Sequence, residues 1–187
     1  MIRFLSSKLF NLLANNLIWI ACVICREETI WIVGPLVIAY LWILIGSTPV
    51  RLTQIFIPAF IGITLDSILT LAGVFEFDNT NLFLPLWMII LWVAFSTTLT
   101  SSLHFLGKNK FIASAVGCIA VPLNYLAGEG FGAVEFGYEY LLTAIGLCFL
   151  WSILLPLLYF STQFQFNKAR EFVKYRVTNG IALVLGH

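Results

Sequence analysis

The sequence predicts an all-α polytopic membrane protein: a bundle of six transmembrane helices with the N and C termini cytoplasmic. Three observations lead to this prediction. The 187 residues are 60% hydrophobic and only 10% charged, long apolar runs follow one another with short connections, and the charges divide unevenly between those connections. Soluble domains carry about 25% charged residues. The connections are too short to hold a soluble domain.

Each predicted span is an apolar run near the roughly 20 residues that cross a bilayer as a helix. The six runs cover residues 9–24, 30–46, 53–75, 83–106, 111–127 and 138–160. We interpret the first as a retained helix and not a cleaved signal peptide, because asparagines interrupt it and no small-residue cleavage site follows. The transmembrane domain is thus residues 1–160. Residues 161–187 form a basic cytoplasmic tail, either solvated or an amphipathic helix on the inner leaflet.

The charges set the predicted orientation, since Lys and Arg accumulate in cytoplasmic loops. With a cytoplasmic N-terminus, nine of the ten basic residues lie inside and only Arg26 lies outside. Seven of the nine carboxylates fall on the outer side: Glu27, Glu28, Glu76, Asp78, Glu129, Glu135 and Glu139. Five or seven spans would lose this separation. The scattered basic residues and the net charge of +1 give no support for nucleic-acid binding.

Asp66 lies in the middle of the third apolar run and is the main candidate site residue. A carboxylate at that depth costs about 2.5–3.5 kcal/mol on insertion scales, so it normally faces other helices or water. Small and polar residues recur on its helical face, at Ala59, Gly62, Thr70 and Gly73. We interpret Asp66 as a binding or proton-switch residue, with a neutral, hydrogen-bonded structural carboxyl group as the alternative.

Asn124 is the expected polar partner of Asp66. Each lies thirteen residues from the cytoplasmic start of its helix, which places both about 20 Å into the membrane. A stripe of small residues around Asn124 would let another helix approach closely. Depth therefore allows the contact, although nothing in the sequence makes the two helices neighbours.

Thr97, Ser101 and His104 share a face of the fourth helix and are further candidates. With Asn11 and Asn15 they are expected to line an inward-opening polar cavity. His104 lies near the cytoplasmic end, roughly 17 Å from the level of Asp66, which is too far for a hydrogen bond. The alternatives are an interfacial histidine without chemistry and hydroxyls that bond within their own helix.

The outer loop of residues 126–140 contains four glycines and the candidates Glu129 and Glu135. These acids would collect cations at the entrance to a path, or the loop is a solvated connector. Cys22 and Cys25 form a CxxC pair, which is interpreted as packing residues more readily than as a redox centre. No metal site is expected, because neither histidine lies near these cysteines.

Several blocks together resemble a bacterial membrane protein family, domain of unknown function 2878. The blocks run from Asn11 and 19–23 through Asp66 with 73–75, 85–87, 91–92, 95 and 98–99, to 122–128 and 132–136. They cover most of the membrane region but not the tail. The resemblance implies membership, architecture and a Gram-negative cytoplasmic (inner) membrane, but no activity.

Two function classes follow from these residues. The first is transport or binding of a small or lipid-like molecule, with Asp66 as a protonatable group. The second is a membrane subunit or accessory component of a lipid-modifying system, which would have a membrane-protein partner. An independent enzyme is disfavoured, because only one carboxylate lies at mid-depth and no His/Asp cluster accompanies it. No cofactor or catalytic residue is expected, and the expected partners are the lipid bilayer and a small or lipid ligand.

Overall fold

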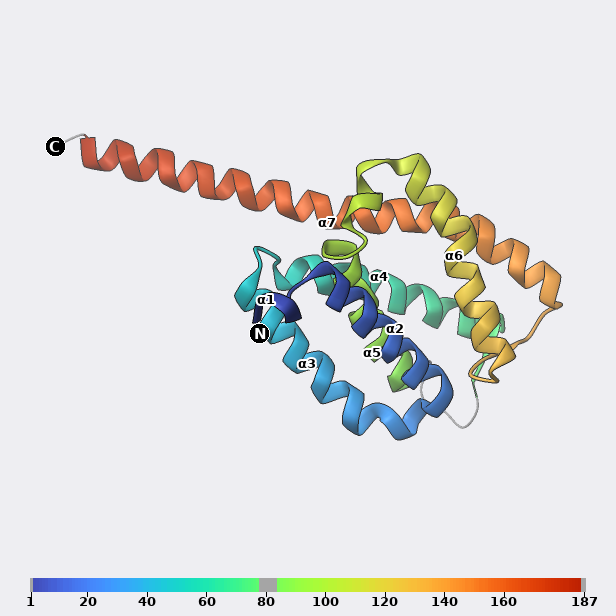
Figure 1. Cartoon of the computed structure of the whole chain (residues 1–187). Helices are drawn as coiled ribbons and strands as arrows, with labels where there is room; N and C mark the ends of the chain where they lie inside the picture. Colours follow the sequence, from blue (N-terminus) through green and yellow to red (C-terminus); the bar gives the residue numbers. More distant parts are fainter. Residues whose placement is uncertain (1, 78–83, 186–187) are drawn as a thin grey trace.

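The computed structural model describes residues 2–77 and 84–185, with side chains from residue 4 to residue 163 outside that gap, and helices dominate it (Figure 1). The elements in chain order are α1 (Ile2–Leu5), α2 (Lys8–Cys25), η1 (Arg26–Thr29), α3 (Ile30–Ser47), α4 (Leu52–Leu71), β1 (Phe75–Glu76), α5 (Leu86–Thr100), η2 (His104–Lys108), α6 (Lys110–Gly130), β2 (Glu135–Phe136) and α7 (Tyr140–Leu185). The all-α prediction is confirmed, with one two-stranded antiparallel pairing, β1 with β2, as the addition.

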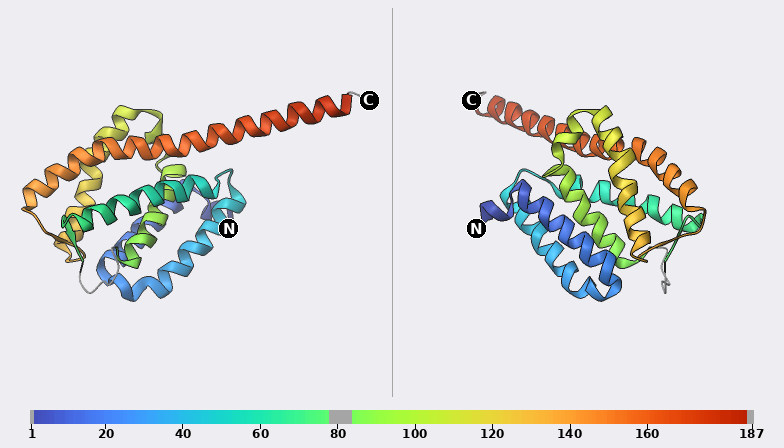
Figure 2. Two further views of the ribbon diagram at one scale, coloured as in Figure 1. Left: turned by 180° about the vertical axis from the view of Figure 1, so that it is seen from behind. Right: turned by 45° about the vertical axis from the view of Figure 1, so that its right-hand side comes forward.

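The first two predicted spans match α2 and α3, which form a helical hairpin (Figures 1 and 2). Ser7 caps α2 by accepting a hydrogen bond from the backbone N–H of Phe10, at 3.2 Å. Arg26 ends α2, because its φ of 49° lies in the left-handed region that interrupts a helix. The single 3-10 turn η1 then reverses the chain into α3.

The third and fourth predicted spans are longer than the helices that form. α4 ends at Leu71, because Gly73 adopts a φ of 69° and the Val74 N–H bonds back to the Leu69 carbonyl at 2.9 Å, as in a Schellman C-cap. α5 begins at Leu86 and ends at Thr100. Residue 83, the predicted start of that span, lies outside the described residues.

The hydroxyl run explains why α5 stops early. Thr97, Thr98 and Thr100 each donate to the carbonyl three residues earlier, at 2.6–3.0 Å. Such bonds compete with the helical ladder. Ser101 follows with φ −122° and ψ −93°, and the chain continues as turns into η2.

The last predicted span starts within two residues of α7, but the helix does not end at residue 160. α7 continues without interruption to Leu185 and extends well beyond the other helices (Figures 1 and 2). The segment expected as a basic tail is therefore helical in its backbone as far as Leu185. The side chains of residues 164–187, including its basic residues, lie outside the description.

Four helical segments in the described part of the chain are long and apolar enough to cross a membrane. They are Lys8–Ser47, Leu52–Leu71, Lys110–Gly130 and Tyr140–Gln163, and α5 is a shorter apolar helix. Large apolar side chains are exposed on them, including Trp31 at 86% and Trp42 at 84%. A soluble protein rarely exposes such contiguous apolar surface, so these features indicate a membrane-embedded protein.

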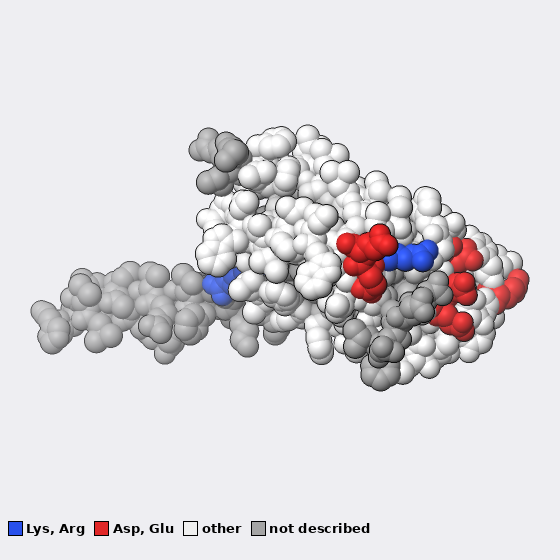
Figure 3. All heavy atoms as spheres, turned by 90° about the horizontal axis from the view of Figure 1, so that it is seen from below, with Lys and Arg blue, Asp and Glu red and all other residues white. Residues whose placement is uncertain are grey.

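The acidic connections lie together at one end of the bundle. Arg26 of η1 donates through Nη2 to the carbonyls of Phe131 and Gly132, which follow α6. Strand β1 pairs with β2 through Phe75 opposite Phe136 and Glu76 opposite Glu135. In Figure 3 the acidic side chains gather on one half of the visible surface with one basic side chain among them, and another basic side chain lies toward the other end.

At the opposite end of the bundle, hydrogen bonds link α7 to the turns around η2 and to the first turn of α4. Tyr159 of α7 donates to the Leu103 carbonyl at 2.8 Å, just before η2. Gln163 donates to the Gly107 carbonyl at 2.7 Å, and Gln54 of α4 donates to the Thr162 carbonyl at 3.2 Å. The first turn of α4, η2 and the middle of α7 therefore lie at one level.

Helix α5 is the shared element of the bundle. It contacts α2 and α3 on one side and α4 and α7 on another. Helices α6 and α7 pack closely against each other, because Gly117 of α6 faces the Trp151 backbone of α7 (Figure 1). A methyl group at Gly117 would overlap the Trp151 carbonyl oxygen.

We predict that Gly117→Ala destabilises the protein, whereas Gly146→Ala of α7 does not. Both changes gain helix propensity, worth about 1 kcal/mol, and no atom lies within 4 Å of a Cβ built at Gly146. Overpacking at Gly117 costs about 1–3 kcal/mol and outweighs that gain. Thermal unfolding of the two variants in detergent measures the difference. Equal melting temperatures would contradict the close α6–α7 contact.

Candidate functional site

The Asp66 carboxyl group accepts hydrogen bonds from two aromatic side chains on two other helices. The indole Nε1–H of Trp92 on α5 donates to Oδ2 at 2.6 Å. The hydroxyl of Tyr125 on α6 lies 2.9 Å from Oδ1 and 3.1 Å from Oδ2. Asp66 itself is fully buried, with 0% exposure. The carboxyl group therefore joins α4, α5 and α6 within the bundle.

The sequence of α4 makes room for this contact one turn before Asp66. A Cβ at Gly62 would overlap the Trp92 ring, so only glycine lets the indole lie flat against α4 there. Trp151 of α7 stacks on the other side of Trp92, with ring centroids 5.7 Å apart and an interplanar angle of 11°. Helix α7 is thereby brought into the same cluster.

The cluster extends to the acidic end through Phe75 of β1. Its ring stacks on Tyr125 with a centroid distance of 5.1 Å and an interplanar angle of 12°. Phe75 is 1% exposed. The short β1–β2 pairing thus fixes an aromatic ring over the tyrosine that binds Asp66.

A pocket of about 270 Å³ lies directly beside this cluster. Its walls come from α2, α5, α6 and α7, with the turns near Leu106 at one end and Val134 at the other. The size is close to the lower bound of about 300 Å³ typical of small-molecule sites. Trp92, Tyr125 and Trp151 form part of the wall, and Asp66 lies behind them.

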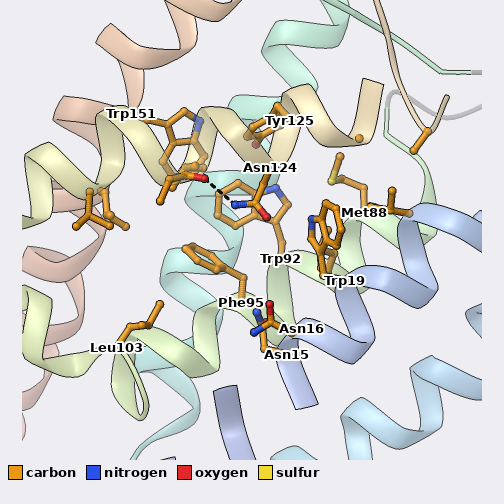
Figure 4. A pocket seen from close by; sticks show the side chains of 18 of the residues that line it. Asn15, Asn16, Trp19, Met88, Trp92, Phe95, Leu103, Asn124, Tyr125 and Trp151 are labelled. Carbon is orange, nitrogen blue, oxygen red and sulfur yellow. Dashed lines mark hydrogen bonds between the residues drawn. The ribbon is translucent and has the colours of Figure 1, made fainter. Parts of the chain in front are cut away.

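The wall is mainly aromatic and aliphatic, with a few amide groups (Figure 4). Asn15 and Asn16 of α2 lie side by side near Phe95, and Asn124 of α6 lies near Trp92 and Tyr125. Among the described residues, none of the side chains that line the pocket is Asp, Glu, Lys, Arg or His. An apolar pocket with few polar groups is the usual form of a binding site for an uncharged ligand.

A second polar cluster, centred on Asn11, lies on the other side of α5. Asn11 Nδ2 donates to the hydroxyls of Tyr40 on α3 and Thr97 on α5, both at 2.8 Å. The Ser102 N–H and hydroxyl donate to Asn11 Oδ1 at 3.2 and 2.6 Å. Asn11 is 1% exposed, so this cluster is a buried contact that joins α2, α3 and α5.

The expected pairing of Asp66 with Asn124 is not formed. Asn124 Nδ2 donates to the Ala120 carbonyl of its own helix at 2.7 Å, and its side chain lines the pocket (Figure 4). The neighbouring Tyr125 takes the place of Asn124 as the partner of Asp66, because its hydroxyl reaches the carboxyl group on α4. The depth estimate identified the helix that supplies the partner of Asp66 and the level of that partner, but it did not identify the residue.

The structure separates the three candidates of the fourth span. Thr97 binds Asn11 as a buried group, with 1% exposure. Ser102, not Ser101, completes that contact, since Ser101 lies at the turn that ends α5. His104 is exposed at the start of η2. Thr97, Ser101 and His104 are not among the residues that line this pocket, whereas Asn15 is, and the inward-opening cavity stays a prediction.

The outer-loop candidates lie at the edge of the pocket and not in its wall. Glu129 is near the end of α6 and Glu135 is exposed in β2, while their neighbours Gly128 and Val134 line the pocket. Cys22 is buried and Cys25 is exposed, and both are free thiols. Among the described residues, no three His, Cys, Asp or Glu side chains come together as a metal site.

Sequence reasoning missed the aromatic side of the site. Trp92 and Tyr125 lie in blocks that carry the family resemblance, but the resemblance assigns them no role, and Trp151 fits the general composition of a membrane helix. Gly62 was noted as part of a small-residue face, and that observation could have indicated a large ring packed against α4.

The fold and the pocket define a class: a helical membrane protein with a buried carboxyl group behind an aromatic pocket. A family described as "Protein of unknown function (DUF2878)" matches residues 8–157. The chain therefore belongs to this family, as the sequence resemblance predicted. No curated protein and no solved structure matches the chain significantly.

We predict that Asp66→Leu lowers stability strongly. The substitution leaves the Trp92 N–H and the Tyr125 hydroxyl without their acceptor, at about 1–3 kcal/mol for each buried group. Asp66→Asn keeps one acceptor oxygen and should be intermediate. Thermal unfolding and near-UV circular dichroism, which reports tryptophan packing, measure the effect.

Thr64→Val is the control for this prediction. Thr64 lies on the same helix, is exposed, and donates to the Phe60 carbonyl of α4 at 2.8 Å. Its replacement should stay within about 0.5 kcal/mol of the parent protein. An Asp66→Leu variant as stable as Thr64→Val would show that the carboxyl group does not organise the bundle.

Proposed function

We propose that this protein binds a small or lipid-like molecule within the membrane, in the pocket between α2 and α6. The pocket itself carries the proposal: about 270 Å³ lined by aromatic and aliphatic side chains with a few amides. Lining residues come from α2 and α6, and α5 and α7 supply the rest of the helical wall. A ligand would enter between these two helices from the lipid, where apolar molecules are concentrated.

Asp66 acts on this pocket indirectly in the proposal. It is buried behind the pocket wall and holds the Trp92 and Tyr125 side chains that face the ligand space. Protonation would convert one carboxylate oxygen of Asp66 from an acceptor into a hydroxyl donor. It would therefore weaken the hydrogen bonds that Asp66 accepts from Trp92 and Tyr125. The proton-switch role predicted from the sequence would therefore operate by moving the pocket wall, and transport would couple to that movement.

The proposal includes six spans, with both termini in the cytoplasm of a bacterial inner membrane. α2 and α3 contain 18 residues each and reverse direction at η1, so Lys8–Ser47 fits two crossings. The hydrogen bonds of Arg26 and the β1–β2 pairing support one common level for the acidic connections. Three basic residues support a cytoplasmic side at the opposite end of the bundle, because Lys and Arg accumulate on that side. Lys8 begins α2, Arg51 precedes α4, and Lys108 ends η2.

Binding is tested with the neighbouring variants Ala120→Trp and Ile119→Trp. Ala120 lines the pocket, whereas Ile119 is 63% exposed on another face of α6. We predict that Ala120→Trp fills the pocket and lowers saturable labelling by a photoreactive lipid-like probe at least tenfold. Ile119→Trp should label as the parent protein does. Equal labelling of both variants would place the binding site elsewhere.

Orientation is tested by single cysteines in a chain whose four native cysteines are replaced by alanine. Glu28→Cys and Glu135→Cys should react in intact cells with a membrane-impermeant maleimide. Lys108→Cys should react only after the inner membrane is permeabilised. Reaction of Lys108→Cys in intact cells would contradict the proposed orientation.

A further inference from the structure

We infer that the ligand of this pocket is an uncharged amphiphile with a hydroxyl group on an elongated apolar body. This inference rests on the proposed binding function and names the chemical class of the ligand. It follows from the absence of charge in the wall, from two polar atoms there without partners, and from the length of the pocket.

The described part of the pocket wall offers no positive charge to an anionic ligand. No lining side chain in the part of the chain that the structure describes is an acid, a base or a histidine. An ion moved from water into an apolar site needs an opposite charge or several hydrogen bonds to offset its lost hydration. The pocket offers no opposite charge, so an uncharged molecule fits it better than a fatty acid or a phospholipid headgroup.

Two atoms of the wall lack hydrogen-bond partners among the described residues. They are Oδ1 of Asn15 on α2 and Nε1 of Trp151 on α7. The first is an acceptor and the second a donor, and Trp151 is 1% exposed. Buried polar atoms in native structures are nearly always paired. Both atoms are themselves buried. We assign the missing partner of Asn15 to a bound molecule, which its carbonyl oxygen reaches once the amide turns toward the pocket.

A hydroxyl group is the simplest partner for an asparagine amide. It donates to the Asn15 carbonyl oxygen and also accepts from a neighbouring N–H. Asn16 already donates to the Leu12 carbonyl at 2.8 Å, which leaves its own carbonyl oxygen as a second acceptor next to Asn15 (Figure 4). A group that can only accept, such as a ketone or an ether, would not match this pair of oxygens.

The apolar body follows from the extent of the lining. The pocket reaches from Leu103 and Leu106 near η2 to Gly128 and Val134 near β2, that is, along most of the bundle. Trp19, Trp87 and Phe95 supply flat apolar surface along this length. An extended hydrocarbon chain fits such a space, and both linear and isoprenoid alcohols have this form.

The test is photolabelling of the full-length protein in lipid nanodiscs, with diazirine probes that share one chain length. The probes are a linear fatty alcohol, an isoprenoid alcohol, the linear fatty acid, and a phosphatidylcholine with the same acyl chain. Saturable labelling is measured by competition with the unlabelled compound, and labelled segments are mapped by mass spectrometry. We expect one or both alcohols to label residues 12–23 and 116–128 saturably, and the relative labelling distinguishes linear from isoprenoid chains.

Asn15→Leu should lower alcohol labelling about five- to tenfold, as expected for one lost hydrogen bond. Thr64→Val, which removes a hydroxyl outside the pocket, should leave it unchanged. Equal or stronger labelling by the fatty acid or the phosphatidylcholine would overturn the inference, and so would an Asn15→Leu variant that labels as the parent does. If Ala120→Trp blocks the labelling seen in either of these cases, the proposed binding function stands, but the ligand is not recognised through a hydroxyl group. The absence of saturable labelling by all four probes would contradict the binding function itself.

Discussion

The bundle depends on one buried carboxyl group that accepts hydrogen bonds from two aromatic side chains. Asp66 would be costly at mid-membrane depth without partners. Trp92 and Tyr125 supply donors on α5 and α6, and Trp151 of α7 stacks on Trp92. Four helices are therefore held by one residue and three rings. Gly62 makes this geometry possible, because any larger side chain would displace the Trp92 ring.

A second polar cluster lies on the other side of α5 from the first. Asn11 joins α2 and α3 to α5 through Tyr40, Thr97 and Ser102. Helix α5 thus belongs to two polar clusters that face different partners, and it also lines the pocket, in part through Trp92 of the first cluster. In lipid, interhelical hydrogen bonds and close packing hold helices together, because the hydrophobic effect does not distinguish helix from lipid. The pocket lies between α2 and α6, two helices that neither cluster connects to each other.

The sequence predicted the helices well and the contacts between them poorly. Hydropathy located all six apolar runs, and the errors at α4 and α5 arose from local backbone chemistry: the positive φ of Gly73 and the threonine bonds that end α5. Asp66 was identified because a membrane carboxyl group is costly wherever it lies. Tyr125 was missed in favour of Asn124, since the two are adjacent and only helix rotation decides which faces Asp66. Helix rotation depends on packing with other helices, which hydropathy does not encode.

We propose that Asp66 shapes the pocket through Trp92 and Tyr125 and does not contact the ligand. A double-mutant cycle on probe affinity tests it most directly, with Asp66→Asn measured alone and in the Trp92→Phe, Tyr125→Phe background. We expect strong non-additivity: Asp66→Asn should change affinity in the parent protein and change it little once both donors are gone. An undiminished effect of Asp66→Asn in the doubly substituted background would contradict this role of Asp66, because the carboxyl group would then act on the ligand directly.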